Sequence, residues 1–392
     1  MNTAKRQGPL SDLRVLEFGQ IAAGPFAGSL FADLGADVVK VENPAGGDGM
    51  RGWPPLSTNE GEAFSENFAS VNRNKRSVAF DLKNQDDVRN LLDLVRVADI
   101  VIENFRAGVL SRLGLGYEDL KAVNPRLVYC SISGYGQKGP YANRGAFDVT
   151  VQAISGLMSI TGHQDMPPVK CGVPVADFSA GLYGAFSALA AVLRARETGE
   201  GCHVDCSMLG SLLGIAALQT SEYFGTGRSI GPMASAHPRN APYQAFRASD
   251  DYFVIAAGND ALWRQVAEAV GRPELTADPR FRTQPDRAKN QAALAALLEE
   301  KFADHTAQYW IDEMDRRGVP CAPINTYDAI LKDPHVETMN LVRPLRLPNG
   351  IETRTVSFPA AFSDCDLGIY REPPGLGAHN DEVMREWCKS SS

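Results

Sequence analysis

Residues 13–42, LRVLEFGQIAAGPFAGSLFADLGADVVKVE, predict a strand, a helix and a second strand in succession. The branched apolar run at 13–18 is typical of a strand buried in a parallel sheet, and DVVKVE at 37–42 repeats the pattern. Between them, residues 26–34 place apolar side chains at helical spacing, with Pro25 suited to a first helical turn and Gly35 to a C-terminal cap. Such a βαβ unit is expected to have a right-handed crossover.

The same alternation continues along the chain. Helices are expected at 88–97 and 110–123, and strands at 99–105 and 127–133. This pattern favours an α/β fold with an open, mostly parallel sheet covered on both faces. The longest predicted helix, 177–196, is apolar nearly all round, so we expect it to be deeply buried. A strand at 200–209 and a helix at 212–223 follow it.

A Gly/Ser/Pro-rich stretch at 225–242 indicates a domain boundary. We therefore expect a large domain over 1–225 and a small α/β domain over 226–329. The small domain is predicted to hold a strand at 252–257 and helices at 262–270, 288–302 and 307–317. The proline-rich segment 344–374 has little periodicity and is interpreted as an extended return segment.

Composition excludes several classes of protein. The 392 residues include 39 Lys and Arg against 47 Asp and Glu, a net charge of -8 without a compensating basic run, which disfavours binding to duplex nucleic acid. No apolar stretch reaches the roughly 18 residues of a membrane span, and the N-terminus lacks a secretory apolar region, so no membrane association is expected. The seven scattered cysteines form no CxxC pair, which favours reduced thiols in a cytoplasmic protein and no metal site.

Two motifs match well-known patterns in the wrong context. GYGQKG at 134–139 fits GxGxxG, but Pro140 and Gly145 follow where a helix has to start, which disfavours a dinucleotide site. GRSIG at 227–231 fits GxSxG, but a helix-like run precedes it and a loop follows, which disfavours a serine hydrolase.

Asp177 ends the stretch CGVPVAD at 171–177 and stands at the expected N-cap of the longest helix. Capping alone would account for an aspartate at this position. A carboxylate at a helix N-terminus is also stabilised as the anion, and an ionised, fixed carboxylate can attack an acyl group. Both interpretations stay open from the residues alone.

Five segments, in order, resemble the family III CoA-transferases. They are AGPF at 23–26 with LGADVVKVE at 34–42, GGD at 46–48 with Arg51, NRNKRS at 72–77 with DLK at 81–83, AD at 98–99 with ENF at 103–105 and LG at 113–114, and SGYG at 133–136 with GP at 139–140. The aspartate before the long helix and RETGEG at 196–201 complete the likeness, which is close over about residues 10–210. The resemblance implies a large Rossmann-like domain, completed by residues 330–392, a small domain, and two subunits interlocked as a homodimer.

The resemblance also implies a chemistry and a site. Asp177 matches the nucleophile that carries CoA as a covalent aspartyl thioester between an acyl-CoA and a carboxylic acid. CoA is a substrate, and no metal or other cofactor is implied. Carried over by position, the CoA contacts fall at Ala22, Ala23, Asn43, Phe80, Asp81, Leu82, Lys83, Asn104, Phe105, Arg106, Arg112, Arg144, Gly145, Ala146 and Phe147. Without a ligand, Lys83, Arg112 and Arg144 read as surface charges and Phe105 as a core residue.

Two alternatives share these features. The α-methylacyl-CoA racemases have the same fold and aspartate, but use a histidine in a Gly-His-Asp triplet where this chain has Ala146, Phe147 and Asp148. A non-catalytic CoA-binding protein would have no need of the nucleophile. For the acceptor, the loop AHPRNAPY at 236–243 resembles that of transferases acting between succinyl-CoA and another dicarboxylate. His237 and Arg239 are the cations expected to bind its second carboxylate, although Arg239 reads equally well as a surface charge.

Overall fold

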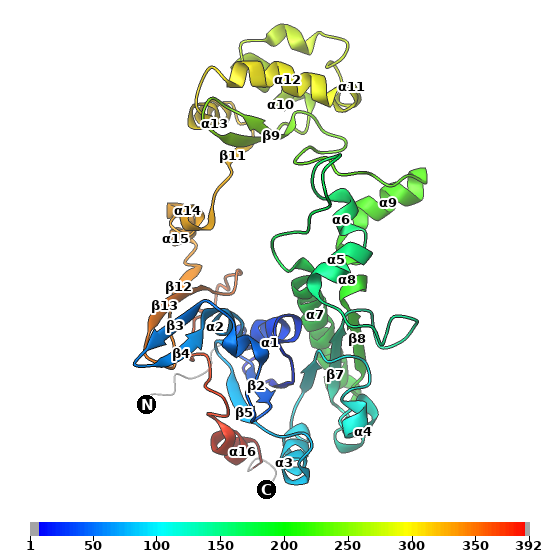
Figure 1. Ribbon diagram of the computed structural model, residues 1–392, viewed down its shortest axis with the longest axis vertical. Coiled ribbons are helices and arrows are strands. Elements are labelled where there is room, and N and C mark those ends of the chain that lie inside the picture. Colours follow the sequence, from blue (N-terminus) through cyan, green and yellow to red (C-terminus); the bar gives the residue numbers. More distant parts are fainter. Residues whose placement is uncertain (1–7, 389–392) are drawn as a thin grey trace. The chain divides into compact units, whose positions relative to one another are not determined.

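The computed structural model describes residues 8–388, which divide into two compact units (Figure 1). The first unit takes the chain up to Leu157, residues Lys170–Ser229 and the chain from Pro334 onwards. The second takes Met158–Val169 and Ile230–Asp333. The C-terminal segment therefore returns to the unit in which the chain begins.

The first unit is built on a six-stranded sheet in the order β5-β2-β1-β6-β7-β8, with every neighbouring pair parallel. Its strands are β1 (Arg14–Glu17), β2 (Asp37–Glu42), β5 (Arg76–Ala79), β6 (Ile100–Glu103), β7 (Val128–Ser133) and β8 (His203–Ser207). The parallel α/β sheet expected from the alternating pattern is confirmed. Near-continuous apolar runs form these strands because both faces of a parallel sheet are buried.

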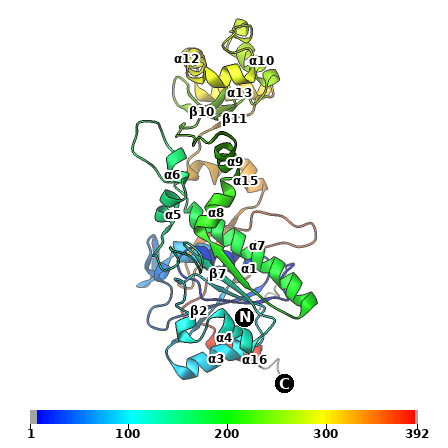
Figure 2. The same ribbon diagram turned by 90° about the vertical axis from the view of Figure 1, so that its right-hand side faces the viewer.

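Helices cover both faces of this sheet (Figures 1 and 2). One face packs against α1 (Ala23–Asp33), α5 (Asp148–Ile154), α7 (Val175–Thr198) and α8 (Met208–Ile215). The other packs against α3 (Gln85–Val95), α4 (Tyr117–Val123) and α16 (Asn380–Cys388). The C-terminal helix α16 lies against α3 and β5, where Trp387 is buried in the core.

The long helix α7 differs from the expectation of burial all round. Ala176, Ala180 and Ala188 are buried against the sheet and α1, but Leu182 and Phe186 are 52% and 75% exposed. Sequence composition does not distinguish the face that packs within the chain from a face left open. The expectation that no apolar stretch reaches the length of a membrane span is wrong for α7, which among the described helices is the one long and apolar enough to cross a membrane; half of its apolar stretch is buried inside the protein.

Three other sequence predictions need correction. The helix expected at 110–123 is split into the short helix η2 (Ser111–Leu113) and α4, because Gly114 adopts a left-handed φ of 70°. The helix expected at 212–223 is two helices, α8 and α9 (Ala217–Thr226), which meet at Ala216. The return segment is only partly extended loop, because β12 (Val342–Arg346) and β13 (Glu352–Val356) form an antiparallel hairpin.

Smaller elements complete the first unit. They are η1 (Gly49–Gly52), the hairpin β3 (Leu56–Asn59) and β4 (Glu62–Ser65), α2 (Glu66–Asn72) and α15 (Pro334–Thr338). The short helix α6 (Leu157–Ile160) stands where the chain passes into the second unit.

The second unit has a three-stranded antiparallel sheet in the order β11-β10-β9. Its elements are β9 (Tyr243–Arg247), β10 (Tyr252–Ala256), α10 (Asp260–Ala269), η3 (Pro273–Thr276), α11 (Gln284–Lys289), α12 (Gln291–Phe302), α13 (Ala307–Arg316), β11 (Cys321–Pro323) and α14 (Tyr327–Ile330). Aromatic side chains, among them Trp263, Phe281 and Phe302, fill its core.

Candidate active site

A pocket of about 280 Å³ lies where β1, β6 and β7 end in the first unit. Strands of a parallel sheet all point the same way, so the loops after their C-terminal ends meet at one edge, where ligands of open α/β sheets bind. The pocket is lined by Gln20, Ile21, Ala22, Ala23, Asn104, Phe105, Arg106, Ala107, Ile132, Ser133, Gly134, Ala142, Arg144, Ala146, Phe147, Asp177 and Met208.

Asp177 enters this pocket from the first turn of α7. It is the third helical residue, because α7 begins at Val175 with Pro174 at the N-cap, so the predicted N-cap position is wrong. A Cβ on Gly181 would lie 2.8 Å from Phe26 and 3.0 Å from the carbonyl oxygen of Ala23. Only glycine therefore lets α7 approach α1 this closely, and that approach brings Asp177 into the same pocket as Ala22 and Ala23.

Asp148, at the start of α5, accepts the hydrogen bond from the N-terminus of α7 that the sequence assigned to Asp177. The backbone N–H of Ala176 donates to Oδ1 of Asp148 over 2.8 Å, and Nε2 of Gln152 donates to Oδ2 over 2.6 Å. Oε1 of Gln152, itself fully buried, accepts from the N–H of Cys171 over 2.8 Å. Asp148 thus satisfies a first-turn N–H of α7 and leaves the Asp177 carboxylate available for chemistry.

Burial, and after it the negative charge of Asp148, raises the pKa of Asp177 to about 7. The expectation of an anion stabilised by the helix N-terminus is therefore wrong in direction. The anion is the less favoured form in a partly desolvated site beside a second carboxylate. A carboxylate that titrates near neutral pH and is poorly solvated is well suited to attack an acyl carbon.

Asp148→Asn is expected to shift the pH dependence of Asp177. In wild type, kcat/KM should rise with pH with a midpoint near pH 7, the pKa of Asp177. Removing the charge of Asp148 lowers that pKa, so the midpoint in Asp148→Asn should lie at a lower pH. The measurement is kcat/KM for an acyl-CoA donor between pH 5 and pH 9. Gln152→Glu, which places a new charge one residue further along the same network, serves as the control and should move the midpoint upwards. An unchanged midpoint in Asp148→Asn contradicts the coupling.

The pocket brings together eight of the residues expected to contact CoA with Asp177: Ala22, Ala23, Asn104, Phe105, Arg106, Arg144, Ala146 and Phe147. Gly145 adjoins them, because a Cβ there would lie 2.9 Å from Nη2 of Arg106. The guanidinium of Arg144 lies 3.9 Å from the centroid of the Tyr141 ring. Phe147, at the place of the racemase histidine, is 70% exposed and has no proton to exchange.

Six predicted contacts lie outside the lining of this pocket: Asn43, Phe80, Asp81, Leu82, Lys83 and Arg112. Phe80 is a core residue. Asn43 and Asp81 accept hydrogen bonds from the backbone N–H groups of Ala45 and Lys83, over 2.8 and 3.0 Å, and so shape turns. Lys83 and Arg112 are exposed, as expected for residues without a ligand. Their predicted role in binding CoA stays a prediction.

His237 and Arg239 belong to the second unit. Nδ1 of His237 accepts from the N–H groups of Arg239 and Asn240, both over 3.1 Å. Burial and the positive charge of Arg239 lower the pKa of His237. His237 therefore shapes this loop through Nδ1, and the predicted role of His237 and Arg239 in binding the acceptor carboxylate stays a prediction.

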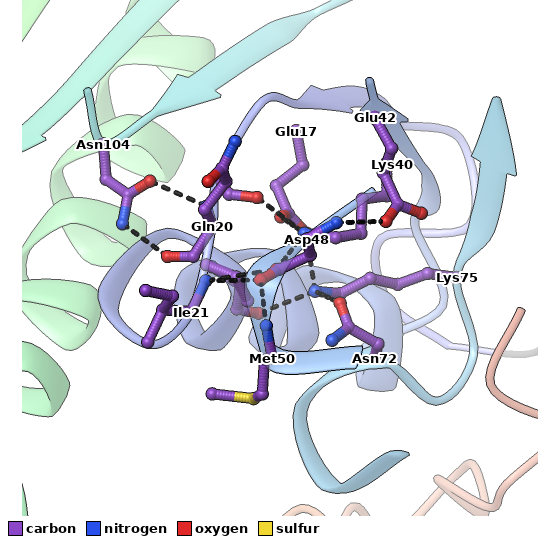
Figure 3. A network of polar contacts seen from close by, with 12 residues as sticks. Glu17, Gln20, Ile21, Lys40, Glu42, Asp48, Met50, Asn72, Lys75 and Asn104 are labelled. Atoms are coloured by element: carbon purple, nitrogen blue, oxygen red, sulfur yellow. Dashed lines mark hydrogen bonds and ion pairs between the residues drawn. The ribbon is translucent and has the colours of Figure 1, made fainter. Parts of the chain in front are cut away.

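Sequence reasoning missed Asp148 and Gln152, which hold the start of α7. It also missed eight residues of the pocket lining: Gln20, Ile21, Ala107, Ile132, Ser133, Gly134, Ala142 and Met208. An acidic residue that begins a helix beside the predicted contact Phe147 is a signal that could have pointed to Asp148. The main chain of Ile21 is held by the buried carboxylate of Asp48, and that of Gln20 by the side-chain amide of Asn104 (Figure 3). Within residues 8–388, no three His, Cys, Asp or Glu side chains gather so as to hold a metal ion.

Comparisons with known proteins identify one family for this chain. The profile of CoA-transferase family III matches residues 10–380. The chain is 37% identical to a succinate–glutarate CoA-transferase of Agrobacterium fabrum, over 97% of this chain and 96% of that protein. It is 40% identical to a succinyl-CoA:mesaconate CoA-transferase of Haloarcula hispanica, over 97% and 96% of the two chains. A CAIB/BAIF family protein from Brucella suis matches in structure with a TM-score of 0.86 and 40% identity, over 97% and 99%.

Proposed function

This chain belongs to CoA-transferase family III, and we propose that it moves CoA from succinyl-CoA to a dicarboxylic acid through a covalent intermediate on Asp177. That it is a CoA-transferase follows from the family and from relatives that match nearly its whole length. The choice of substrates rests on those relatives, whose names pair succinate or succinyl-CoA with glutarate or mesaconate. The observation that carries the choice of nucleophile is the position of Asp177 within the pocket.

The proposed reaction exchanges acyl bonds in four balanced steps. A carboxylate oxygen of Asp177 attacks the thioester carbon of succinyl-CoA, the C–S bond breaks, and CoA leaves as the thiolate, so that Asp177 and the succinyl group are joined as a mixed anhydride. The thiolate attacks the aspartyl carbon and releases succinate, which leaves CoA bound to Asp177 as a thioester. The acceptor carboxylate displaces the thiolate to form a second anhydride. Finally the thiolate attacks the acceptor acyl carbon, and the Asp177 carboxylate is regenerated.

This sequence needs no oxidant and no net proton transfer. Its chief requirement is a fixed carboxylate next to donors that can stabilise each tetrahedral oxyanion. The first N–H groups of α1, at Ala23 and Gly24, have no acceptor within the helix, and Ala23 lines the same pocket as Asp177. We propose that they serve this purpose. Arg106 and Arg144, both exposed in the pocket lining, are proposed to pair with phosphate groups of CoA.

A donor–acceptor matrix tests the substrates. Acetyl-, formyl- and succinyl-CoA are each combined with mono- and dicarboxylates in wild type and in Arg239→Ala. We expect wild type to prefer succinyl-CoA with a dicarboxylate such as glutarate or mesaconate. Loss of one charge-assisted contact in Arg239→Ala should lower kcat/KM for the dicarboxylate by roughly 10-fold or more and leave monocarboxylates unaffected.

Arg264→Ala, which removes an exposed arginine on α10 of the same unit, is the matched control and should retain the dicarboxylate preference. Equal use of monocarboxylates by wild type overturns the proposed acceptor. Unaltered selectivity in Arg239→Ala overturns the role of that residue.

We also propose that the protein is a homodimer of the cytoplasm. All seven cysteines are free, in keeping with a reducing compartment. Apolar side chains are exposed on α7 and α9: Leu182, Phe186, Leu218 and Phe224 are 52%, 75%, 64% and 81% exposed, and a second subunit would cover them.

Sedimentation equilibrium is expected to give twice the chain mass of 42.4 kDa for wild type. Phe186→Asp places a charge in the middle of the apolar face and should shift the equilibrium towards monomer. Val356→Asp, at an exposed position of β13, is the control and should remain dimeric. A wild-type protein that sediments as a monomer at micromolar concentration disproves the dimer.

A further inference from the structure

The loop between β1 and α1 forms one wall of the pocket in an unfavourable backbone conformation. Gln20, Ile21 and Ala22 all line the pocket that contains Asp177. Ile21 has a φ of 65°, in the left-handed region that β-branched residues very rarely adopt. Such a conformation persists only where surrounding interactions hold it, and it is found mostly at functional sites.

A buried ion pair holds this loop from behind (Figure 3). Both carboxylate oxygens of Asp48 accept from the N–H of Ile21, over 3.0 and 3.1 Å. Nζ of Lys40 lies 3.0 Å from Oδ2 of Asp48 and donates to the carbonyl oxygen of Gly19 over 2.6 Å. The pair therefore binds the loop at two main-chain groups, the carbonyl of Gly19 and the N–H of Ile21. Both side chains are fully buried.

A second lysine extends the network beneath α1. Nζ of Lys75 donates to Glu17 over 2.6 Å, to the carbonyl oxygen of Pro25 over 2.7 Å and to Asn72 over 3.0 Å. Lys40 donates to the other oxygen of Glu17 over 2.9 Å. Two lysines thus balance two carboxylates in a region from which water is excluded. Apolar residues of similar size often stabilise a core at least as well as such charges, so their presence points to a role in specifying one conformation.

Gln20, which lies between Gly19 and Ile21, is held by the side chain of Asn104. Oδ1 of Asn104 accepts from the N–H of Gln20 over 2.8 Å, and its Nδ2 donates to the carbonyl oxygen of Gln20 over 2.9 Å. Four successive main-chain polar groups, from the carbonyl of Gly19 to the N–H of Ile21, are therefore each bonded to a side chain. Core packing alone does not require this arrangement.

We propose that the network of Glu17, Lys40, Asp48 and Lys75, together with Asn104, is a positioning device for substrate binding. It fixes the main chain of residues 19–22, at the entry to α1, before the substrate arrives, so the pocket wall facing Asp177 needs no reorganisation when acyl-CoA binds. Asp48 acts through Ile21, since it does not itself line the pocket. This inference rests on the proposed function in one respect, that the ligand of the pocket is an acyl-CoA.

The test compares Asp48→Asn with a matched control, Asp33→Asn. Asp33 is a buried carboxylate paired with Arg73 at the opposite end of α1 from the pocket. Calorimetry with CoA and kinetics with succinyl-CoA are the readouts, with thermal unfolding measured in parallel. We expect Asp48→Asn to weaken CoA binding and raise KM by roughly 10- to 100-fold, and Asp33→Asn to lose stability with unchanged KM.

Glycine at position 21 supplies a rescue. It adopts the left-handed conformation without strain, so adding Ile21→Gly to Asp48→Asn should recover part of the lost affinity. Equal CoA affinity and KM in wild type and Asp48→Asn, with a loss of stability like that of Asp33→Asn, shows that the network is structural only and overturns the inference while the proposed function stands.

Hydrogen exchange of the wild-type protein needs no substitution and no ligand. The N–H groups of Gln20 and Ile21 should exchange at least about 100-fold more slowly than those of exposed loops. Exchange of these two N–H groups at the rate of an open loop overturns the inference. Because this measurement uses wild type, it decides the question even if Asp48→Asn does not fold. If wild type neither binds CoA nor transfers it, the proposed function fails, and protection at these two positions still decides whether the loop is held.

Discussion

Replacing Asp177 with alanine is expected to lower CoA transfer by at least about 10⁴-fold, because no other group in the pocket can form the aspartyl anhydride and thioester. Asp148 is nearby, but both its oxygens are engaged by Ala176 and Gln152. The measurement is steady-state transfer from succinyl-CoA, together with mass spectrometry of the protein after incubation with the donor. Wild type should carry CoA on Asp177, and hydroxylamine should remove it. Substantial activity in the alanine variant, or a wild type without an adduct, would falsify the covalent mechanism.

The isosteric variant Asp177→Asn separates loss of chemistry from loss of fold. In the folded protein the pKa of Asp177 is raised from 3.8 to about 7, so the group binds a proton more tightly folded than unfolded. Its ionisation has no effect on stability below about pH 4, destabilises the fold increasingly between about pH 4 and 7, and has its full effect above pH 7. Asp177→Asn should therefore unfold at a higher temperature than wild type at pH 8, by a free energy of at most about 4 kcal/mol, with almost no advantage at pH 4. Inactivity combined with this gain in stability identifies a functional carboxylate; an inactive variant that is less stable at pH 8 argues instead for a structural role.

Trp387→Ala is expected to cost about 3–5 kcal/mol of unfolding free energy, because it truncates a large side chain that is almost completely buried. The Trp387 ring is 1% exposed between α16 and the sheet, and its Nε1 donates to Oδ2 of Asp37 over 2.9 Å. Truncation leaves a large cavity and removes one hydrogen bond from a carboxylate that Arg76 also binds. The side chain therefore anchors the C-terminal segment onto the sheet.

Chemical denaturation of the full chain measures this cost. Trp53→Ala is the matched control, since Trp53 is 44% exposed and its truncation should stay within about 0.5 kcal/mol of wild type. A Trp387→Ala protein that unfolds at the wild-type denaturant midpoint shows that α16 is not part of the cooperative unit. CoA affinity is the second measurement and should be unchanged in folded Trp387→Ala, because no residue of α16 lines the pocket.

The sequence by itself determined the parallel α/β sheet and the reaction class. The strand expected at 99–105 is found as β6, because burial on both faces favours an apolar run such as Ile100, Val101 and Ile102, which is a local property. The family likeness identified Asp177 and eight other pocket residues, since short motifs at strand ends keep their order along the chain. Two local predictions failed for different reasons. Gly114 interrupts a helix that the sequence predicts as continuous. The helices α7, α8 and α9 are apolar on faces that do not pack within the chain, and composition does not distinguish these faces from buried ones.

Only the tertiary structure decided how the site works. Asp148 caps α7 from 28 residues away, which frees Asp177, and its charge together with burial sets the pKa of Asp177 near 7. Lys75 reaches Glu17 across 58 residues, and Asp48 reaches Ile21 across 27. A charged residue in the sequence predicts a solvated surface group, because burial of a charge is favourable only when partners surround it. Those partners come from separate strands and loops, so their arrangement depends on the whole fold and leaves no periodic signal in the chain.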